Sequence, residues 1–86
     1  MPSRPLKAPS KEKAQVVFGA ALRSFREAQA LTQEALAERA DLHTNYVSSV
    51  ERGERNLSLN NIVRLAYALD MDVSALLRPL DKRQQP

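Results

Sequence analysis

The sequence contains no cysteine, only two glycines among 86 residues, and no long apolar run. Without cysteine, disulfide bonds, thiolate metal sites and a cysteine nucleophile are excluded. Without an apolar run of about 18 residues or a signal-peptide pattern, we expect a soluble, cytoplasmic protein with no membrane partner. Few glycines beside many alanines, leucines, arginines and glutamates favour an all-α fold.

The net charge of +3 is concentrated near the two ends of the chain. Residues 1–13 carry a net +3 and residues 78–86 a net +2, whereas residues 14–77 hold six arginines against eight acids. Any binding of nucleic acid must therefore depend on where particular side chains stand, because bulk attraction cannot supply it.

The expected organisation is one small domain between two tails. Residues 1–10 carry three prolines and no periodicity, so we expect a flexible basic arm. Residues 11–78 form the folded domain, and residues 79–86 form a flexible polar tail. The length allows a single compact core. Domains of this size are often only marginally stable, and dimerisation is one common way in which they gain stability.

Apolar spacing predicts five short helices. Phe18, Leu22 and Phe25 recur at i, i+4 and i+7 and define a first helix that Ser10 can cap and that ends near residue 29. The last two helices are capped by serine or aspartate. Ser58 can cap the fourth helix, whose apolar positions are Leu59, Ile62, Leu65, Ala66 and Leu69. Asp72 can cap the fifth helix, which runs from Val73 to Leu77 and is closed by Pro79.

Between them lie two helices separated by a brief turn. Thr32 can cap the first, from residue 33 to about 39, and the second runs from about 44 to 52. Gly53 stands where a helix often ends in left-handed backbone. This spacing is a helix-turn-helix pattern, in which the second helix enters the DNA major groove.

The second helix of the pair has side chains suited to that task. Val47 and Val50 face inward, and the outward side chains are short and polar. Asparagine can pair with the N6 and N7 edge of adenine, and a threonine methyl can touch the methyl of thymine. We therefore expect base contacts from Thr44, Asn45, Ser48 and Ser49.

Two other interpretations of a helix pair of this kind are open. The polar row on this helix can be a plain solvated face, or the same fold can serve as an antitoxin-like protein-interaction module. An enzyme is disfavoured by a single histidine, no paired carboxylates in a pocket and no glycine-rich phosphate loop. We expect no metal, no cofactor and no small-molecule ligand.

The stretch "LTQEALAERADLHTNYVSSVERGERNLSL" resembles the phage-repressor-like (XRE or Cro-type) helix-turn-helix family, and the likeness covers about residues 16–77. The stretch "YVSSVERGERNLSLNNIVRLAYALDM" most resembles the controller proteins of restriction–modification systems. The resemblance implies a compact five-helix, lambda-repressor-like domain. It implies a transcriptional regulator of double-stranded DNA with a recognition helix at about 44–52.

The resemblance also implies roles for particular residues. Arg26 and Glu51 match a structural ion pair. The DNA backbone would be contacted by Gln33, Tyr46, Arg52, Arg55, Asn56, Asn60 and Asn61. A homodimer on a palindromic operator is expected, with half-sites roughly 34 Å apart. Excess apolar surface near the C-terminus suggests the dimer interface, at Leu69, Met71, Val73, Leu76 and Leu77.

Three positions depart from the family pattern. The family usually has glycine at position 41 and often at position 30, where this chain has Asp41 and Ala30. Aspartate tolerates left-handed backbone, whereas at Ala30 we expect a helix end that avoids positive φ. His43 replaces the usual serine or threonine cap, so we expect the start of the recognition helix to fray before DNA binds.

Overall fold

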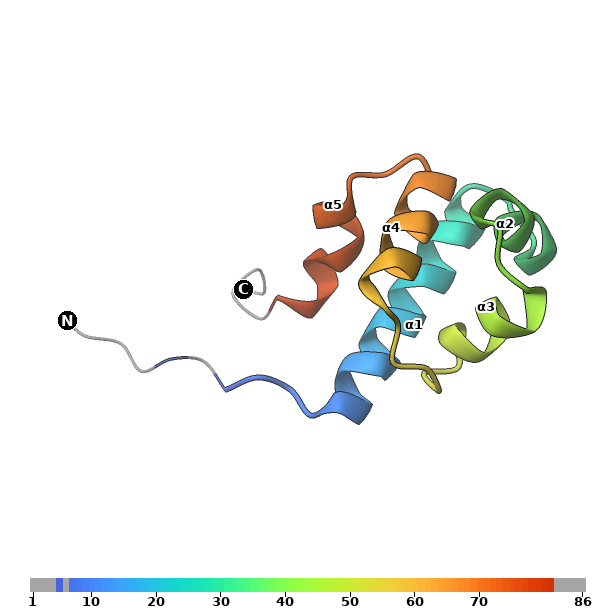
Figure 1. Ribbon diagram of the computed structural model, residues 1–86. Helices are drawn as coiled ribbons and strands as arrows, with labels where there is room; N and C mark the ends of the chain where they lie inside the picture. Colours follow the sequence, from blue (N-terminus) through green and yellow to red (C-terminus); the bar gives the residue numbers. More distant parts are fainter. Residues whose placement is uncertain (1–4, 6, 82–86) are drawn as a thin grey trace.

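The computed structural model describes residue 5 and residues 7–81. That part of the chain contains five α-helices, one short 3-10 helix and no strand (Figure 1). The elements are α1 (Lys11–Ala28), α2 (Gln33–Ala40), α3 (Thr44–Glu51), α4 (Leu59–Ala68), α5 (Val73–Leu77) and η1 (Arg78–Leu80). The all-α prediction is confirmed, and α1, α2 and α3 each end within one residue of the predicted position.

Hydroxyl side chains begin three of the helices where the sequence predicts caps. Ser10, Thr32 and Ser58 each accept a hydrogen bond from the backbone N–H three residues further on, at 3.0 or 3.1 Å. Each such cap stabilises its helix by about 1 kcal/mol. Asp72 also precedes its helix in extended backbone, but its side chain makes no capping hydrogen bond to the described residues.

Four helices end in the same way, with one residue in left-handed backbone. These residues are Ala30, Asp41, Gly53 and Asp70, with φ between 55° and 79°. In each case the N–H of that residue bonds to the carbonyl three residues earlier. The next N–H bonds to the carbonyl five residues before it. This pair of bonds is the Schellman motif, which satisfies helix-end carbonyls.

The expectation for Ala30 is wrong, since its φ is 57°. Left-handed backbone costs an alanine about 1–2 kcal/mol, and the surrounding contacts override that cost. The chain must reverse between the end of α1 and the cap at Thr32, and the Arg26 guanidinium donates to the Leu31 carbonyl at 2.7 Å. The Schellman bonds at the end of α1 and the Arg26–Leu31 hydrogen bond therefore hold Ala30 in this conformation.

The core lies along α1, which contacts α3, α5 and η1, while α2 packs on α3 and α4 (Figure 1). Phe18 and Leu22 are buried as predicted, whereas Phe25 is only partly buried at the edge. The amide of Gln29 donates to the Leu69 carbonyl at 2.6 Å and joins the ends of α1 and α4. The buried apolar residues are Phe18, Leu22, Leu36, Ala37, Ala40, Val47, Val50, Leu65, Ala66, Leu69 and Leu76.

The part of the chain that the structure describes extends past the predicted boundary at residue 79. Pro79 and Leu80 belong to η1, and Leu80 packs partly buried against the core. An apolar side chain at position 80 explains the difference, because it gains by covering the core. Most of the predicted arm and tail, at residues 1–4, 6 and 82–86, lies outside the described residues.

Candidate nucleic-acid interface

The helix pair α2 and α3 is joined by residues 41–43 and lies at one end of the molecule (Figure 1). Asp41 adopts the left-handed conformation, as predicted, and its carbonyl accepts a hydrogen bond from Arg64 of α4 at 3.1 Å. His43 Nδ1 accepts from the Asn45 N–H at 3.2 Å. His43 therefore makes the capping bond for which serine or threonine is usual.

A close backbone approach seats α3 on α1. Val47 and Val50 are buried on the inner side of α3, as predicted. Gly19 of α1 faces the same turn. A Cβ added to Gly19 would lie 2.3 Å from the Val50 carbonyl oxygen and 2.8 Å from that of Glu51. The two helices can pack at this distance only because position 19 has no side chain.

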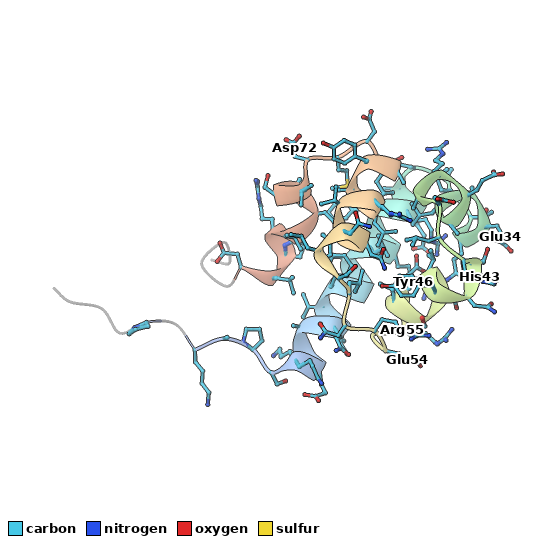
Figure 2. All side chains as sticks on the ribbon, in the orientation of Figure 1. Glu34, His43, Tyr46, Glu54, Arg55 and Asp72 are labelled. Carbon is cyan, nitrogen blue, oxygen red and sulfur yellow. The ribbon has the colours of Figure 1, made fainter. Side chains whose placement is uncertain are left out.

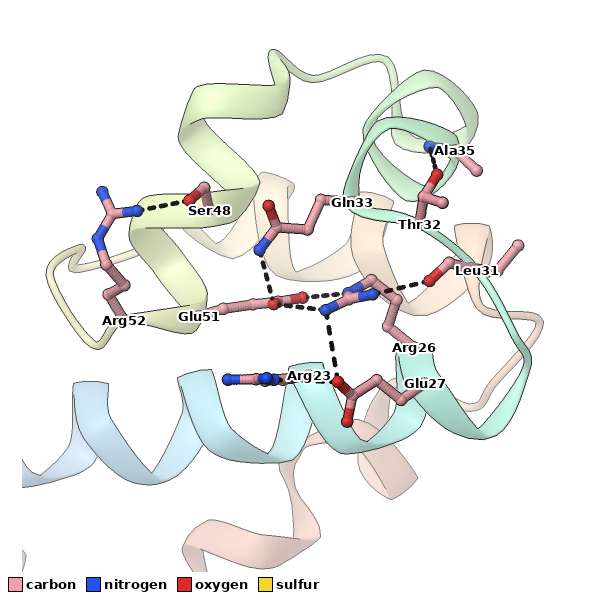
Figure 3. Close-up of polar contacts among 10 residues, drawn as sticks. All are labelled: Arg23, Arg26, Glu27, Leu31, Thr32, Gln33, Ala35, Ser48, Glu51 and Arg52. Atoms are coloured by element: carbon pink, nitrogen blue, oxygen red, sulfur yellow. Dashed lines mark hydrogen bonds and ion pairs between the residues drawn. The ribbon is translucent and has the colours of Figure 1, made fainter.

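The predicted ion pair between Arg26 and Glu51 is present and joins α1 to the end of α3 (Figure 3). Arg26 Nε donates to Glu51 Oε2 at 2.7 Å, and Nη2 donates to Oε1 at 3.0 Å. The two side chains are only 11% and 4% exposed. The hydrogen bond to Glu51 raises the pKa of Arg26, so the guanidinium stays charged.

Gln33, the first residue of α2, completes this network. Its Nε2 donates to Glu51 Oε1 at 3.0 Å, so one carboxylate links three helices (Figure 3). Gln33 is half-buried, and one of its two amide hydrogens is used in this bond. The start of α2 and the end of α3 are thereby fixed relative to each other.

The N-terminal part of α3 carries the open polar face. Asn45 is exposed, while Thr44 and Ser48 are half-buried. The Ser48 hydroxyl accepts a hydrogen bond from Arg52 Nη1. Three of the four predicted base-contacting residues therefore stand where a partner can reach them.

Ser49 does not stand there, and its expected base contact is wrong. Ser49 is 5% exposed. Its hydroxyl donates a hydrogen bond to the Tyr46 carbonyl at 2.8 Å and accepts one from Arg55 Nε at 3.0 Å. A serine inside a helix often donates its hydroxyl to a backbone carbonyl of the preceding turn and does not point outward to a partner. The loop after α3 then covers the hydroxyl with Arg55.

Tyr46, on α3, and Arg55, in the loop after it, lie together (Figure 2). The Arg55 guanidinium stands 5.7 Å from the centre of the tyrosine ring, within the range of a cation–π contact. The phenol oxygen accepts from Asn61 Nδ2 at 3.1 Å, so its own O–H remains a donor. Asn61, predicted to reach the DNA backbone, uses this amide hydrogen to hold Tyr46 in place.

Arg52 follows α3 and is exposed. Its Nε and Nη2 donate to the two carboxylate oxygens of Glu54 at 3.1 and 3.2 Å. These bonds lower the pKa of Glu54, which is therefore ionised at neutral pH. Asn56 and Asn60, the remaining predicted backbone contacts, are exposed.

Three residues at this interface were not singled out from the sequence. Gly19 permits the close packing of α1 and α3, Glu54 engages Arg52, and Arg64 holds the turn between α2 and α3. A lone glycine inside a helical pattern was an available signal of close backbone approach. Nothing in the sequence pattern indicated the contact of Arg64.

The predicted dimer residues do not form one surface. Leu69 and Leu76 are fully buried in the core, so their assignment to an interface is wrong. An apolar pattern does not distinguish a residue covered by its own chain from one left for a partner. Met71 and Val73 line a hollow of about 340 Å³ beside α4, while Leu77 lines a separate one near α1.

Within the described residues, no helix combines the length and apolar character needed to cross a bilayer. The same residues contain no group of three or more histidine or acidic side chains placed to hold a metal ion.

Comparison with known proteins agrees with this geometry. The family model described as Helix-turn-helix (HTH_3) matches residues 22–76. Control protein C.SmaI of Serratia marcescens is 48% identical over 56 residues, which cover 65% of this chain and 67% of the relative. Control protein C.BamHI of Bacillus amyloliquefaciens is 41% identical over 63 residues, covering 72% and 78%.

Solved structures give the same result. The restriction-modification controller protein C.AhdI from Aeromonas hydrophila is 48% identical, with a TM-score of 0.73 over 74% of this chain and 97% of that one. The hypothetical transcription factor NHTF from Neisseria has a TM-score of 0.75 at 32% identity, over 96% and 93%. These relatives are described as control proteins or as a hypothetical transcription factor. The chain belongs to the XRE-type helix-turn-helix family of DNA-binding transcriptional regulators.

Proposed function

We propose that this protein binds a palindromic operator as a homodimer, with α3 in the major groove of each half-site. One observation carries the proposal. Thr44, Asn45 and Ser48 lie at the open end of a helix whose other end is locked to α1 by the Arg26–Glu51 pair. A rigid helix with polar groups at its N-terminal end suits direct reading of base edges. A cytoplasmic location follows from this proposal.

Contacts to phosphate would come from the residues around that face. Arg52, Arg55 and Asn56 lie in or beside the loop after α3, and Asn60 stands in the first turn of α4. The Tyr46 O–H and the second amide hydrogen of Gln33 are further donors. Such contacts fix the position of a protein on the duplex, and base contacts supply the sequence preference.

Replacing Asn45 or Thr44 with alanine tests the base contacts. Each substitution is expected to reduce discrimination between operator and scrambled DNA by about 1–3 kcal/mol, because one base-edge contact is lost. Operator would first be identified by selection from a random DNA library, and affinities would be measured by fluorescence anisotropy at fixed salt. Ser24→Ala, an exposed position on α1, is the control.

A palindromic consensus among the selected sequences supports both sequence-specific DNA binding and the dimer. Retention of full discrimination by both alanine variants would contradict the assignment of α3. If no DNA motif is enriched, the antitoxin-like protein-interaction module becomes the better explanation of this fold.

The proposed dimer surface is the exposed apolar side of α4 and the hollow next to it. Leu59 and Tyr67 are 72% and 76% exposed, and apolar side chains grouped on one exposed face mark a candidate interface. Val63 stands one turn from each of them on the same helix and is half-buried. Tyr67, Met71 and Val73 line the adjoining hollow. This surface replaces the predicted set that included buried Leu69 and Leu76.

Leu59→Glu and Tyr67→Glu are each expected to convert the dimer to monomer at about 10 µM, because a carboxylate in an apolar interface must be desolvated without a partner. Gel filtration with light scattering measures the mass. Val16→Glu adds the same charge at another exposed apolar position, 57% exposed on α1, and should leave the dimer intact. A wild-type chain that is monomeric at this concentration would disprove the dimer.

We further propose that the regulated genes belong to a restriction–modification system. The support is similarity to three control proteins, C.SmaI, C.BamHI and C.AhdI. Mapping the bound sites in the source genome tests this assignment. Sites ahead of endonuclease or methyltransferase genes are expected, and sites only elsewhere would indicate a general regulator of the family.

A further inference from the structure

Glu54 is the only acidic residue between positions 52 and 61, the segment that supplies most of the proposed phosphate contacts. The left-handed residue Gly53, with φ of 79°, reverses the chain directly after α3. Glu54 is thereby brought beside Arg52, and the two side chains are 57% and 55% exposed. Figure 2 shows Glu54 beside Arg55 on the same side of the molecule as Tyr46.

The bonds of Arg52 employ every nitrogen of its guanidinium. Nε and Nη2 donate to the two oxygens of Glu54, and Nη1 donates to the Ser48 hydroxyl. The paired bonds to a carboxylate have the forked geometry that arginine uses with phosphate. A DNA phosphate that binds Arg52 in this way must therefore displace Glu54.

We propose that Glu54 is an internal competitor for the DNA backbone, and that binding exchanges an Arg52–carboxylate pair for an Arg52–phosphate pair. The inference rests on the proposed DNA-binding function. In the free protein the pair has no net charge, so Arg52 does not attract DNA as a free cation. In the complex, the released carboxylate faces the phosphates. Both effects weaken binding and reduce its dependence on salt.

The exchange also involves Ser48. While Arg52 donates to its hydroxyl, one acceptor site of Ser48 is occupied. When Arg52 turns to a phosphate, that site becomes available to a base edge. Contact with the backbone is therefore linked to the freedom of one of the predicted base-contacting side chains.

A purely structural role for the pair is a weaker explanation. Exposed ion pairs contribute little to stability, because solvent screens them and the side chains lose freedom. Arg23 and Glu27 on α1 form a pair of nearly the same kind, with Nε–Oε2 at 3.1 Å and 64% and 54% exposure. That pair offers a control away from the exposed face of α3. Glu27 Oε2 also lies 4.0 Å from Arg26 Nη2, so the control counts only if the melting of Glu27→Gln coincides with that of the wild type.

The experiment compares Glu54→Gln with Glu27→Gln, each of which raises the net charge by one. Affinity for a selected operator duplex is measured by fluorescence anisotropy between about 50 and 200 mM KCl. Glu54→Gln is expected to bind about two- to fivefold more tightly at the lowest salt. The slope of log K against log salt is expected to steepen by about 0.9, the value for one phosphate contact.

Glu27→Gln is expected to change affinity less than twofold and to leave the slope unchanged. In an Arg52→Gln background, Glu54→Gln is expected to change the slope less than it does in the wild type, because competition for Arg52 is absent and only the repulsion between the carboxylate and the phosphates is removed. Thermal melting of all variants should coincide with that of the wild type, which separates binding from folding.

The inference is overturned if Glu54→Gln binds as the wild type does or more weakly. Weaker binding would mean that Glu54 orients Arg52 for its contact. Equal tightening by Glu27→Gln would also overturn it, since general charge would then explain the effect. A wild-type chain that binds no selected duplex contradicts the proposed function itself, which keeps the two failures distinct.

Discussion

Arg26→Met is expected to lower the free energy of unfolding by about 3–5 kcal/mol, the usual cost of removing one partner from a buried ion pair. The reason is the carboxylate that remains. Glu51 is 4% exposed, and without Arg26 its one remaining side-chain donor among the described residues is the Gln33 amide. Small domains have only about 5–15 kcal/mol of stability, so this variant should be partly unfolded at 37 °C. Urea denaturation followed by circular dichroism measures the loss.

The double variant Arg26→Met with Glu51→Met is the control. Replacing both charges with apolar side chains removes the stranded carboxylate, so most of the lost stability should return. Its discrimination between operator and scrambled DNA should nevertheless fall, because α3 and the Gln33 amide lose their shared anchor. If Arg26→Met lowers the free energy of unfolding by less than about 1 kcal/mol, the Glu51 carboxylate is solvated in another way and the ion pair is not essential for stability.

Gly19→Ala is expected to lower the free energy of unfolding by about 3 kcal/mol, the upper end of the range for overpacking. Inside an ordinary helix this substitution is favourable, because alanine is the better helix former by about 1 kcal/mol. Here the new methyl would lie 2.3 Å from the Val50 carbonyl oxygen. That oxygen belongs to backbone and cannot turn aside, so α3 must move away from α1.

The neighbouring substitution Ala20→Gly is the matched control, since residue 20 is exposed on the same helix. It should cost about 1 kcal/mol through propensity alone. For a chain of this size, 3 kcal/mol corresponds to a fall in Tm of about 12–24 °C, easily measured by calorimetry. A rise in Tm for Gly19→Ala would show that α1 and α3 are not in backbone contact.

Much of the fold could be predicted because local signals agree with one another. Ser10, Thr32 and Ser58 mark helix starts, and each makes its capping bond. The spacing of α2 and α3 identified the helix-turn-helix, and Val47 and Val50 face the core as the pattern requires. The Arg26–Glu51 pair joins residues 25 positions apart, and only the family resemblance suggested it.

The errors arise from contacts that the pattern of residue types does not reveal. Ser49 has the side chain of a base-reading residue, yet Arg55 and the previous helical turn enclose it. Leu69 and Leu76 read as surplus apolar residues, yet the core has room for both. Ala30 is exposed and alanine has no local preference for positive φ, yet the residue takes the left-handed position of the Schellman motif that ends α1. Periodicity identifies an apolar or polar side chain and does not show what covers it.

The eight residues of α3 divide into two halves with separate tasks. Glu51 at one end connects three helices, and Val50 rests against Gly19. Thr44 and Asn45, at the other end, stand outside the buried core. Under the proposed function, exchanges at positions 44 and 45 are expected to alter the preferred DNA sequence and to leave the fold unchanged. Such a division would let one scaffold acquire new operators repeatedly.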